Sequence, residues 1–134
     1  MTDARLTHEI IGAAIDVHRE LGPGLLEIVY REALCHELAS RNLALEKEKP
    51  IPAIYKTVKL DCGYRADIVV CGRVIVEVKA ISAIAPVHDA VMLTYLRLSG
   101  CKIGLLINFY SPVLKDGVKR YVWKYTVADA KEEI

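Results

Sequence analysis

The sequence lacks a long apolar run. No segment approaches the roughly 20 apolar residues that a helix needs to cross a bilayer. His8, Glu9 and Asp16 interrupt the N-terminal segment, which is therefore unlike a secretory signal. We expect a soluble, cytoplasmic protein with no membrane partner.

The sequence also lacks an excess of charge of either sign. The 18 lysine and arginine residues balance 17 aspartate and glutamate residues, which leaves a formal net charge of +1. This balance excludes a general electrostatic attraction to nucleic acid. Any binding to nucleic acid must therefore depend on a local patch.

Cysteine is scarce, and the four residues are widely spaced, at Cys35, Cys62, Cys71 and Cys101. None of them forms a Cys-x-x-Cys pair, which is the spacing of common zinc and redox sites. The pattern favours reduced structural thiols over disulfides or zinc ligands.

The chain does have enough apolar material for one core. Its 134 residues are 53% hydrophobic and 26% charged, which is typical of a globular chain rather than a disordered one. No internal repeat, linker or low-complexity tract divides the sequence. We therefore expect residues 1–134 to form a single domain.

Periodicity predicts the order of helices and strands. Apolar residues at helical spacing indicate helices, whose ends are marked by glycine, proline or polar residues. The expected helices cover residues 6–21, about 28–40 and 86–99. Short segments rich in β-branched residues indicate strands, which are expected at residues 45–49, 53–60, 64–70, 74–80, 102–109 and 118–127. This order predicts one α/β domain.

The strands at 64–70 and 74–80 form the most informative segment. Cys71-Gly72-Arg73 separates them, and its glycine suits a three-residue hairpin loop. A shift of one residue in the pairing would put Asp67 among valines. The expected pairs are Val70–Val74, Ile68–Val76 and Ala66–Val78 on an apolar face, and Val69–Ile75, Asp67–Glu77 and Arg65–Lys79 on the other.

Two carboxylates that face each other in a sheet repel, so a fold that keeps them there needs a compensating positive charge. Asp67 and Glu77 offer the oxygen ligands that suit Mg²⁺ or Mn²⁺, and the Val78 carbonyl adds another. Lys79 shares the face of Glu77, where its ammonium could orient or polarise a water for attack on a phosphodiester. The alternative is an ion-pair cluster on a solvated face of the sheet.

The segment Gly24-Leu25-Leu26-Glu27-Ile28-Val29-Tyr30 resembles the heptapeptide that names the GxxExxY protein family. That prokaryotic family is grouped with the PD-(D/E)XK nuclease superfamily, which includes inactive members. The resemblance covers nearly the whole chain. It implies a restriction-endonuclease-like α/β core, a central mixed β-sheet flanked by helices, with Asp67, Glu77 and Lys79 at the catalytic positions. Other segments that look like family landmarks are Tyr64-Arg65-Ala66-Asp67, Val76-Glu77-Val78-Lys79 and Gly104-Leu105-Leu106-Ile107-Asn108-Phe109.

The heptapeptide supplies two further candidates. By resemblance to related nucleases, Glu27 would be a third carboxylate that faces the metal. Alternatively, Glu27 interacts favourably with the free N–H groups in the first turn of a helix. Tyr30 shares that helix face, where it either contacts a substrate phosphate or closes a hydrogen bond in the core.

One position departs from the pattern of many related nucleases, which carry Gln-x-x-x-Tyr on the helix after the lysine strand. Tyr95 matches the tyrosine and is a candidate substrate contact, but Val91 stands where glutamine is expected. The missing amide removes a polar contact to substrate or water, so activity could be reduced or redirected. Arg65, on the face of the predicted site, is a further candidate for substrate binding.

Other polar and aromatic residues allow two interpretations. His18 and His88 could each reach the cleft, although a lone histidine is more often structural or solvated. The alternating residues of the last expected strand would either stack nucleic-acid bases or cover the sheet or a dimer interface. These residues are Lys119, Tyr121, Trp123 and Tyr125.

Three functional hypotheses follow. The first is a metal-dependent phosphodiesterase that hydrolyses nucleic acid, with DNA as the expected polymer, by means of a metal-activated water. The second is a catalytically inactive module of the same fold that binds nucleic acid or a protein partner. The third is a homodimeric scaffold that uses the aromatic residues of the terminal strand.

Overall fold

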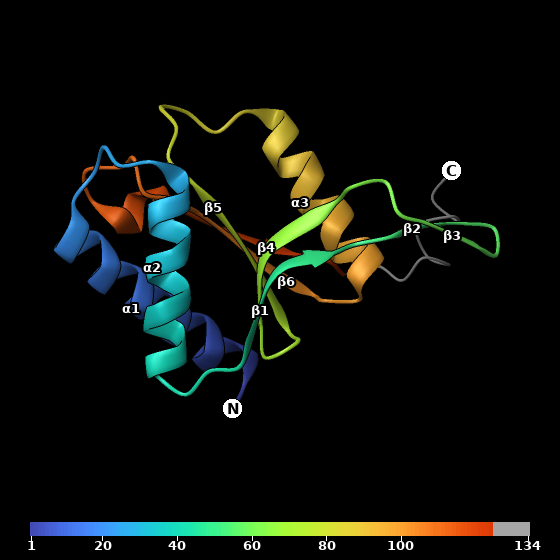
Figure 1. The fold of residues 1–134 in the computed structure, drawn as a ribbon, viewed down its shortest axis with the longest axis horizontal. Coiled ribbons are helices and arrows are strands. Elements are labelled where there is room, and N and C mark those ends of the chain that lie inside the picture. The colour runs from blue at the N-terminus through green and yellow to red at the C-terminus, as the bar shows by residue number, and fades with distance from the viewer. Residues whose placement is uncertain (125–134) are drawn as a thin grey trace.

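The computed structural model describes residues 1–124. Within these residues, five strands form a central sheet in the order β1-β4-β5-β6-β7 (Figure 1). Strands β5 and β6 run parallel and the other neighbours antiparallel, so the sheet is mixed. These strands are β1 (Leu45–Pro50), β4 (Arg65–Val70), β5 (Val74–Lys79), β6 (Ile103–Asn108) and β7 (Val118–Val122).

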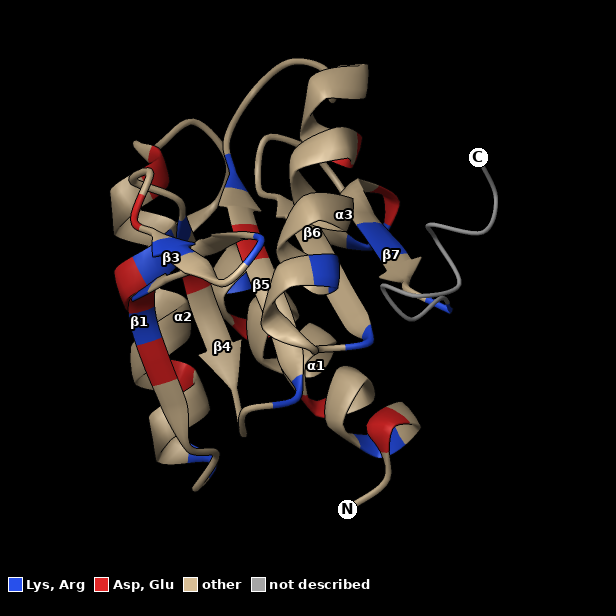
Figure 2. Ribbon diagram, turned by 90° about the vertical axis from the view of Figure 1, so that its right-hand side faces the viewer, with Lys and Arg blue, Asp and Glu red and all other residues tan. Residues whose placement is uncertain are grey.

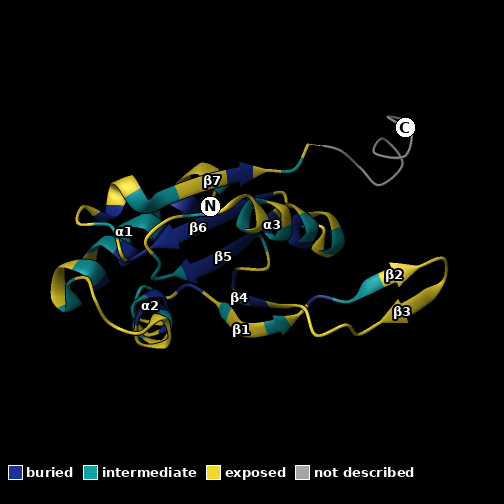
Figure 3. Cartoon of the chain, turned by 90° about the horizontal axis from the view of Figure 1, so that it is seen from above, coloured by how far each residue is buried: buried dark blue, intermediate teal, exposed yellow. Residues whose placement is uncertain are grey.

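Helices cover both faces of this sheet. The helices α1 (Asp3–Leu21) and α2 (Glu27–Ser40) pack together on one face, and α3 (Pro86–Ser99) lies on the other (Figures 1 and 3). A short 3-10 helix, η1 (Leu114–Gly117), precedes β7. The expected mixed β-sheet flanked by helices is therefore confirmed.

Local signals account for the ends of the helices. Helix α1 begins at Asp3 rather than at residue 6, because the Thr2 side chain accepts a hydrogen bond from the Arg5 N–H at 3.1 Å and caps the helix. Helix α3 begins with Pro86 and is followed by Gly100, whose φ of 80° is left-handed.

The hairpin of β4 and β5 has the expected register over its first half. The structure pairs Val70 with Val74, Val69 with Ile75 and Ile68 with Val76. Gly72 in the connecting loop has a φ of 64°, which glycine adopts without strain. Successive side chains of a strand point to opposite faces of the sheet. The side chains of this hairpin therefore belong to two hydrophobic clusters, one packed under α1 and α2 and the other under α3.

Beyond Ile68 and Val76 the predicted register was wrong. The ladder between β4 and β5 stops there, and Ala66 packs in the α3-side cluster instead of pairing with Val78 on the apolar face. The reason is chemical, because the side chains of Asp67 and Glu77 accept backbone hydrogen bonds at the point where ladder bonds would otherwise continue.

Residues 53–60 form a hairpin and not the single strand that was expected. Strand β2 (Ala53–Tyr55) pairs antiparallel with β3 (Val58–Leu60), and Lys56 in the turn has a φ of 56°. The turn at Lys56-Thr57 contains no glycine, proline, asparagine or aspartate, so no common turn residue marks the reversal. This hairpin projects from the body of the molecule, and most of its residues are exposed (Figure 3).

Three further expectations can be compared with the structure. All four cysteines are free in the structure; Cys35 is buried, Cys101 is half-buried, and Cys62 and Cys71 are exposed. A strand was expected at residues 118–127, and strand β7 ends at Val122. Residues 125–127 of the expected strand lie outside the described residues. None of the helices within residues 1–124 combines the length and the apolar character of a membrane span.

Candidate active site

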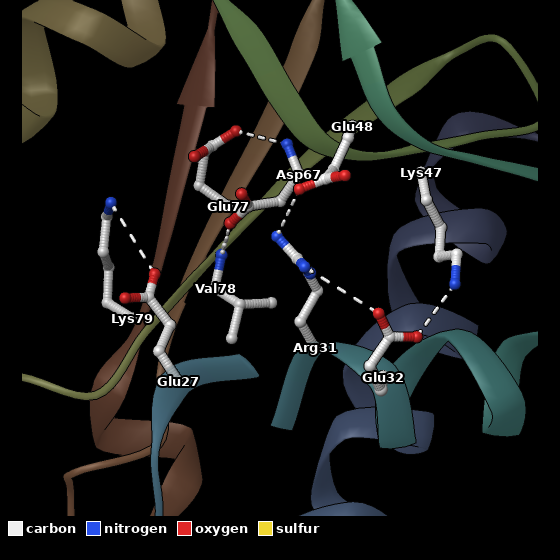
Figure 4. A network of polar contacts seen from close by, with 9 residues as sticks. All are labelled: Glu27, Arg31, Glu32, Lys47, Glu48, Asp67, Glu77, Val78 and Lys79. Carbon is white, nitrogen blue, oxygen red and sulfur yellow. Dashed lines mark hydrogen bonds and ion pairs between the residues drawn. The ribbon is translucent and has the colours of Figure 1, made fainter. Parts of the chain in front are cut away.

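Asp67 on β4 and Glu77 on β5 form the centre of the site, where the two strands separate (Figure 4). The backbone N–H of Asp67 donates to Oε1 of Glu77 at 2.9 Å, and the N–H of Val78 donates to Oδ2 of Asp67 at 2.8 Å. Each carboxylate therefore accepts a hydrogen bond from the backbone of the neighbouring strand. These bonds hold the two acidic side chains next to each other.

Burial governs the electrostatics of this pair. Glu77 is only 7% exposed, and burial, followed by the charge of Asp67, raises its pKa from 4.5 to about 8. Burial also raises the pKa of Asp67, against the opposing effects of the hydrogen bond from Val78 and the charge of Lys79. Ionisation of both carboxyl groups is therefore unfavourable unless a further positive charge lies nearby.

Lys79 and Glu27 meet beside the carboxylate pair. Lys79 is the last residue of β5 and Glu27 the first of α2, and Lys79 Nζ lies 4.0 Å from Oε1 of Glu27. The charges of both residues act on Glu77. The structure thus brings Glu27 to the site residues through the start of α2 and gives it Lys79 as a direct partner.

The donor set fits a hard divalent cation. Asp67 and Glu77 supply two carboxylates and Val78 a carbonyl, and Mg²⁺ commonly binds through one or two carboxylates while it keeps several waters. The mutual repulsion of the pair is also what a bound cation would offset. Within residues 1–124, no group of three or more His, Cys, Asp and Glu side chains gathers into a metal cluster. A third carboxylate such as Glu27 is therefore not part of a preformed cage.

Two charged residues that sequence reasoning missed lie near Asp67. Arg31 follows Glu27 by one turn of α2, and its Nη1 lies 3.1 Å from Oε1 of Glu48 on β1 (Figure 4). The spacing of four residues from Glu27 could have indicated Arg31, because it puts both on one helix face. Glu48 is left out of the pairing of β1 with β4, and nothing in the local sequence marks that irregularity.

Tyr30 lies in the core. It has no exposed surface, its ring stacks on Phe109 with centroids 4.6 Å apart, and its hydroxyl donates to the Gly22 carbonyl at 2.5 Å. The hydroxyl also accepts from the Leu25 N–H at 3.1 Å, which fixes the turn before α2. Its hydrogen bonds are thus made inside the protein, and we leave Tyr30 out of the proposed substrate contacts.

Arg65 and Tyr95 lie near the start of β4, beside Asp67. Arg65 is exposed, and its Nη1 lies 3.3 Å from Oδ1 of Asp61. Tyr95 is only 7% exposed and meets the ring of Tyr64 edge-on, with centroids 5.7 Å apart. Burial, followed by the charge of Glu77, raises the pKa of Tyr95. Arg65 is accessible to a substrate, whereas Tyr95 acts mainly in packing beside the site.

A pocket of about 70 Å³ opens beside Glu77 and Lys79, between β5 and α3. Val91 lines this pocket, so the position where an amide was expected does lie at the site. The isopropyl group of Val91 offers neither a donor nor an acceptor. The departure seen in the sequence therefore removes a polar group from the wall of the pocket.

The two histidines have different surroundings. His88 lines the same pocket, and its Nδ1 accepts from the Ala85 N–H at 2.9 Å at the start of α3. His18 instead lies near Phe109, and its Nε2 is 2.9 Å from the carbonyl oxygen of Ser111. His18 joins α1 to the segment before η1 and is a structural residue.

The residues of β7 pack against α3. Tyr121 is buried in the α3-side cluster and its hydroxyl hydrogen-bonds to Asp89. Lys119 Nζ lies 2.8 Å from the same carboxylate, and Trp123 packs against the cluster. These contacts support the interpretation that Lys119, Tyr121 and Trp123 cover the sheet. Tyr125, the last residue of the predicted alternation, lies outside the described residues.

Comparisons with curated proteins and with solved structures give no match. A family model described as the PD-(D/E)XK nuclease superfamily matches residues 4–121, a range that contains the whole site. The narrower GxxExxY assignment remains a prediction from the heptapeptide. The match spans most of the sequence and agrees with the mixed sheet and its flanking helices, so the chain belongs to the PD-(D/E)XK nuclease superfamily.

Proposed function

We propose that the protein is a metal-dependent phosphodiesterase that hydrolyses nucleic acid, with DNA as the expected polymer. The observation that carries this proposal is the pair of half-buried Asp67 and buried Glu77, fixed by backbone N–H groups, with Lys79 on the same strand as Glu77. Membership of a nuclease superfamily supports a reaction of this class.

Asp67, Glu77 and the Val78 carbonyl would hold Mg²⁺ or Mn²⁺. A divalent cation in such a site lowers the pKa of a bound water and offsets charge that develops on phosphate oxygens. The contribution of the protein is preorganisation, because the backbone hydrogen bonds keep both carboxylates in place before substrate arrives.

Lys79 is the residue that we assign to the attacking water. Its side chain is 25% exposed at the edge of the pocket, so its ammonium is able to donate to a water or to a phosphate oxygen. Glu27 restrains this ammonium and adds negative charge that favours a cation. Arg65, exposed near the start of β4, is the candidate contact to the substrate backbone.

The first test is cleavage of single- and double-stranded DNA and RNA in Mg²⁺ or Mn²⁺. We expect the wild type to cut at least one of these polymers and Lys79→Ala to lose the activity. Lys102→Ala, which removes an exposed lysine outside the site, serves as the matched control. Cleavage that survives Lys79→Ala would contradict the assigned role of the ammonium.

The second test addresses the metal without relying on turnover. Ligands that bind the native state raise its apparent stability, so titration with Mn²⁺ should raise the melting temperature of the wild type. Asp67→Asn should reduce or abolish that shift. Absence of a shift in the wild type would speak against a metal-dependent reaction at this site.

The second candidate function is an inactive module that binds nucleic acid. The observation in its favour is Val91, which presents a hydrocarbon surface where related nucleases carry an amide. This function predicts binding without turnover, and an affinity that changes little in Lys79→Ala. Metal-dependent cleavage by the wild type would exclude it.

A further inference from the structure

Arg31 has an unusual place between α2 and the edge of the candidate site. Its side chain is only 17% exposed, and Figure 4 shows it beside Asp67 and between Glu48 and Glu32. The charge of Arg31 reaches Asp67, where it counteracts the effect of burial on the pKa of that carboxyl group. A positive group is thus held next to the residues that would bind the cation.

The guanidinium of Arg31 does not use all of its hydrogen-bond donors. Its Nη1 contacts Glu48 at 3.1 Å, its Nη2 lies 3.8 Å from Glu32, and its buried Nε has no hydrogen-bond partner among the described residues. Arg41, the residue that follows the end of α2, is different. All three of its nitrogens contact carboxylates, those of Glu9, Asp16 and Glu37. A guanidinium carries five donors, so Arg31 keeps donors available for another ligand.

The partner of Arg31 lies at a break in the β1–β4 ladder, directly opposite Asp67. The pairing of β1 with β4 passes from Lys47–Ile68 to Lys49–Ala66 and leaves out Glu48, whose φ is 48°. A positive φ is unfavourable for a residue with a Cβ atom, and residues held in such sparsely populated backbone regions cluster at active sites and ligand clamps. Here the strained backbone lies where the Glu48 carboxylate meets Arg31.

This ion pair is easily replaced. The Glu48 side chain is 62% exposed, and contacts between a cation and such an exposed carboxylate contribute little in water. A phosphate diester offers two oxygens to the planar guanidinium and forms stronger, bidentate hydrogen bonds. Substrate phosphate would therefore compete successfully with Glu48 for Arg31.

We propose that Arg31 is a substrate-binding residue that exchanges Glu48 for a backbone phosphate of the nucleic acid bound at Asp67 and Glu77. This inference rests on the proposed function, because it requires nucleic acid at the site. It adds a specific anchor on α2 and gives the strained backbone at Glu48 a role, that of occupying the guanidinium until substrate arrives.

The experiment is fluorescence anisotropy with labelled DNA oligonucleotides, single- and double-stranded, in Mg²⁺ and in the Lys79→Ala background. Hydrogen bonds to charged groups imply that Arg31→Ala weakens binding by about tenfold or more. The salt dependence should also change, with a slope of log K against log salt that is smaller by about one phosphate contact. Arg41→Ala, the matched control, should leave affinity and slope unchanged.

Arg31→Lys and Glu48→Gln separate binding from a structural role. Arg31→Lys keeps the charge but loses the planar fork, so it should recover part of the affinity. Glu48→Gln should tighten binding by up to about fivefold, the upper range for an exposed ion pair, and should have no effect in the Arg31→Ala background. An equal effect of Glu48→Gln in both backgrounds would overturn the exchange.

Two outcomes distinguish this inference from the proposed function. If the wild type cleaves nucleic acid but Arg31→Ala binds it as Arg41→Ala does, Arg31 is only a structural ion-pair residue and the present inference fails alone. If the wild type neither cleaves nor binds any of the polymers, the proposed function fails and the role of Arg31 fails with it.

Discussion

Glu77 combines burial with an ionisable group, and the consequence is a dependence of stability on pH. Its pKa is about 8 in the folded chain, against 4.5 as the ordinary value, through burial first and the charge of Asp67 second. A carboxyl group with a raised pKa binds its proton more tightly when folded. The free energy of unfolding should therefore fall as the pH rises from about 4.5 to about 8, and then level off.

Glu77→Gln tests this dependence, because glutamine keeps the shape of the side chain without titrating. In the absence of divalent cations we expect the variant to be more stable than the wild type at about pH 9, by roughly 1 to 4 kcal/mol. At about pH 4, where Glu77 is protonated in both states, the two proteins should be nearly equal. Urea denaturation across this range is the measurement, and parallel profiles for the two proteins would contradict it.

Val91 is the second residue with a specific consequence. Its side chain lines the pocket beside Glu77 and Lys79 and is only partly buried, so a longer side chain has room at the rim. Val91→Gln should restore a donor and an acceptor at the site, and we expect it to raise the rate of cleavage with little loss of stability. Leu93→Gln, an exposed change on the same helix, is the matched control. A lower rate in Val91→Gln than in this control would refute the prediction.

At the scale of residues, the sequence indicated the centre of the site better than its surroundings. The pairing near the hairpin loop was enough to bring Asp67 and Glu77 close together, although the ladder stops one residue before them and their side chains take its place. Whether a helix residue such as Tyr30 faces the core or the substrate depends on the rotation of α2 against the sheet. That rotation is set by contacts far away in the sequence, and the role of Arg31 was missed for the same reason.

At the scale of elements, Asn108 links the end of β6 to the segment that follows β5. It is 5% exposed and pairs with Lys79 across the parallel strands. Its side chain accepts from the N–H of Ile81 at 3.1 Å and donates to the Ile81 carbonyl at 2.8 Å. The same oxygen accepts from the Tyr110 N–H at 3.3 Å. Asn108 therefore fixes the direction in which the chain leaves Lys79.

Asn108→Ala should weaken both stability and activity. The change removes the side-chain partner of the partly buried N–H and carbonyl groups of Ile81, which costs roughly 1 to 3 kcal/mol. It should also lower the rate of cleavage, because the strand end that carries Lys79 is released. Ser40→Ala, which removes an exposed hydrogen bond at the end of α2, should stay within about 0.5 kcal/mol of the wild type. Thermal melts and cleavage assays check both effects, and an Asn108→Ala protein as active as Ser40→Ala would contradict the positioning role.

Elements were predictable where their pattern is local. Helix α3, with proline at its start and glycine after its end, agrees with the expected segment, and β6 agrees with its expected apolar run to within a residue at each end. The hairpin of β2 and β3 was not predictable, because its turn at Lys56-Thr57 carries none of the common turn residues. The end of the ladder between β4 and β5 was also missed. There the side chains of Glu77 and Asp67 accept the hydrogen bonds that backbone carbonyls accept in a regular ladder, and alternation does not indicate such a change.

At the scale of the whole molecule, charge is evenly mixed. The net charge is +1, and Figure 2 shows acidic and basic residues following one another along β1. The immediate surroundings of the site are nevertheless rich in carboxylates, with Glu27, Glu48, Asp67 and Glu77 close together (Figure 4). A neutral molecule with an acidic centre has little reason to bind a polyanion without help.

This distribution predicts that divalent cations control binding as well as chemistry. In the Lys79→Ala background, Mg²⁺ should strengthen binding to a labelled DNA oligonucleotide by roughly tenfold, because a cation held by Asp67 and Glu77 adds positive charge that attracts a phosphate. Sodium chloride at equal ionic strength, as the control for screening, should weaken binding.

A variant that carries both Asp67→Asn and Glu77→Gln should lose this dependence. Added Mg²⁺ should no longer strengthen binding, because no carboxylate pair remains to hold the cation. Equal affinity of the Lys79→Ala protein with and without Mg²⁺ would show that the acidic pair does not lie where the substrate binds. The carboxylates would then be a structural cluster in a protein that binds nucleic acid elsewhere or not at all.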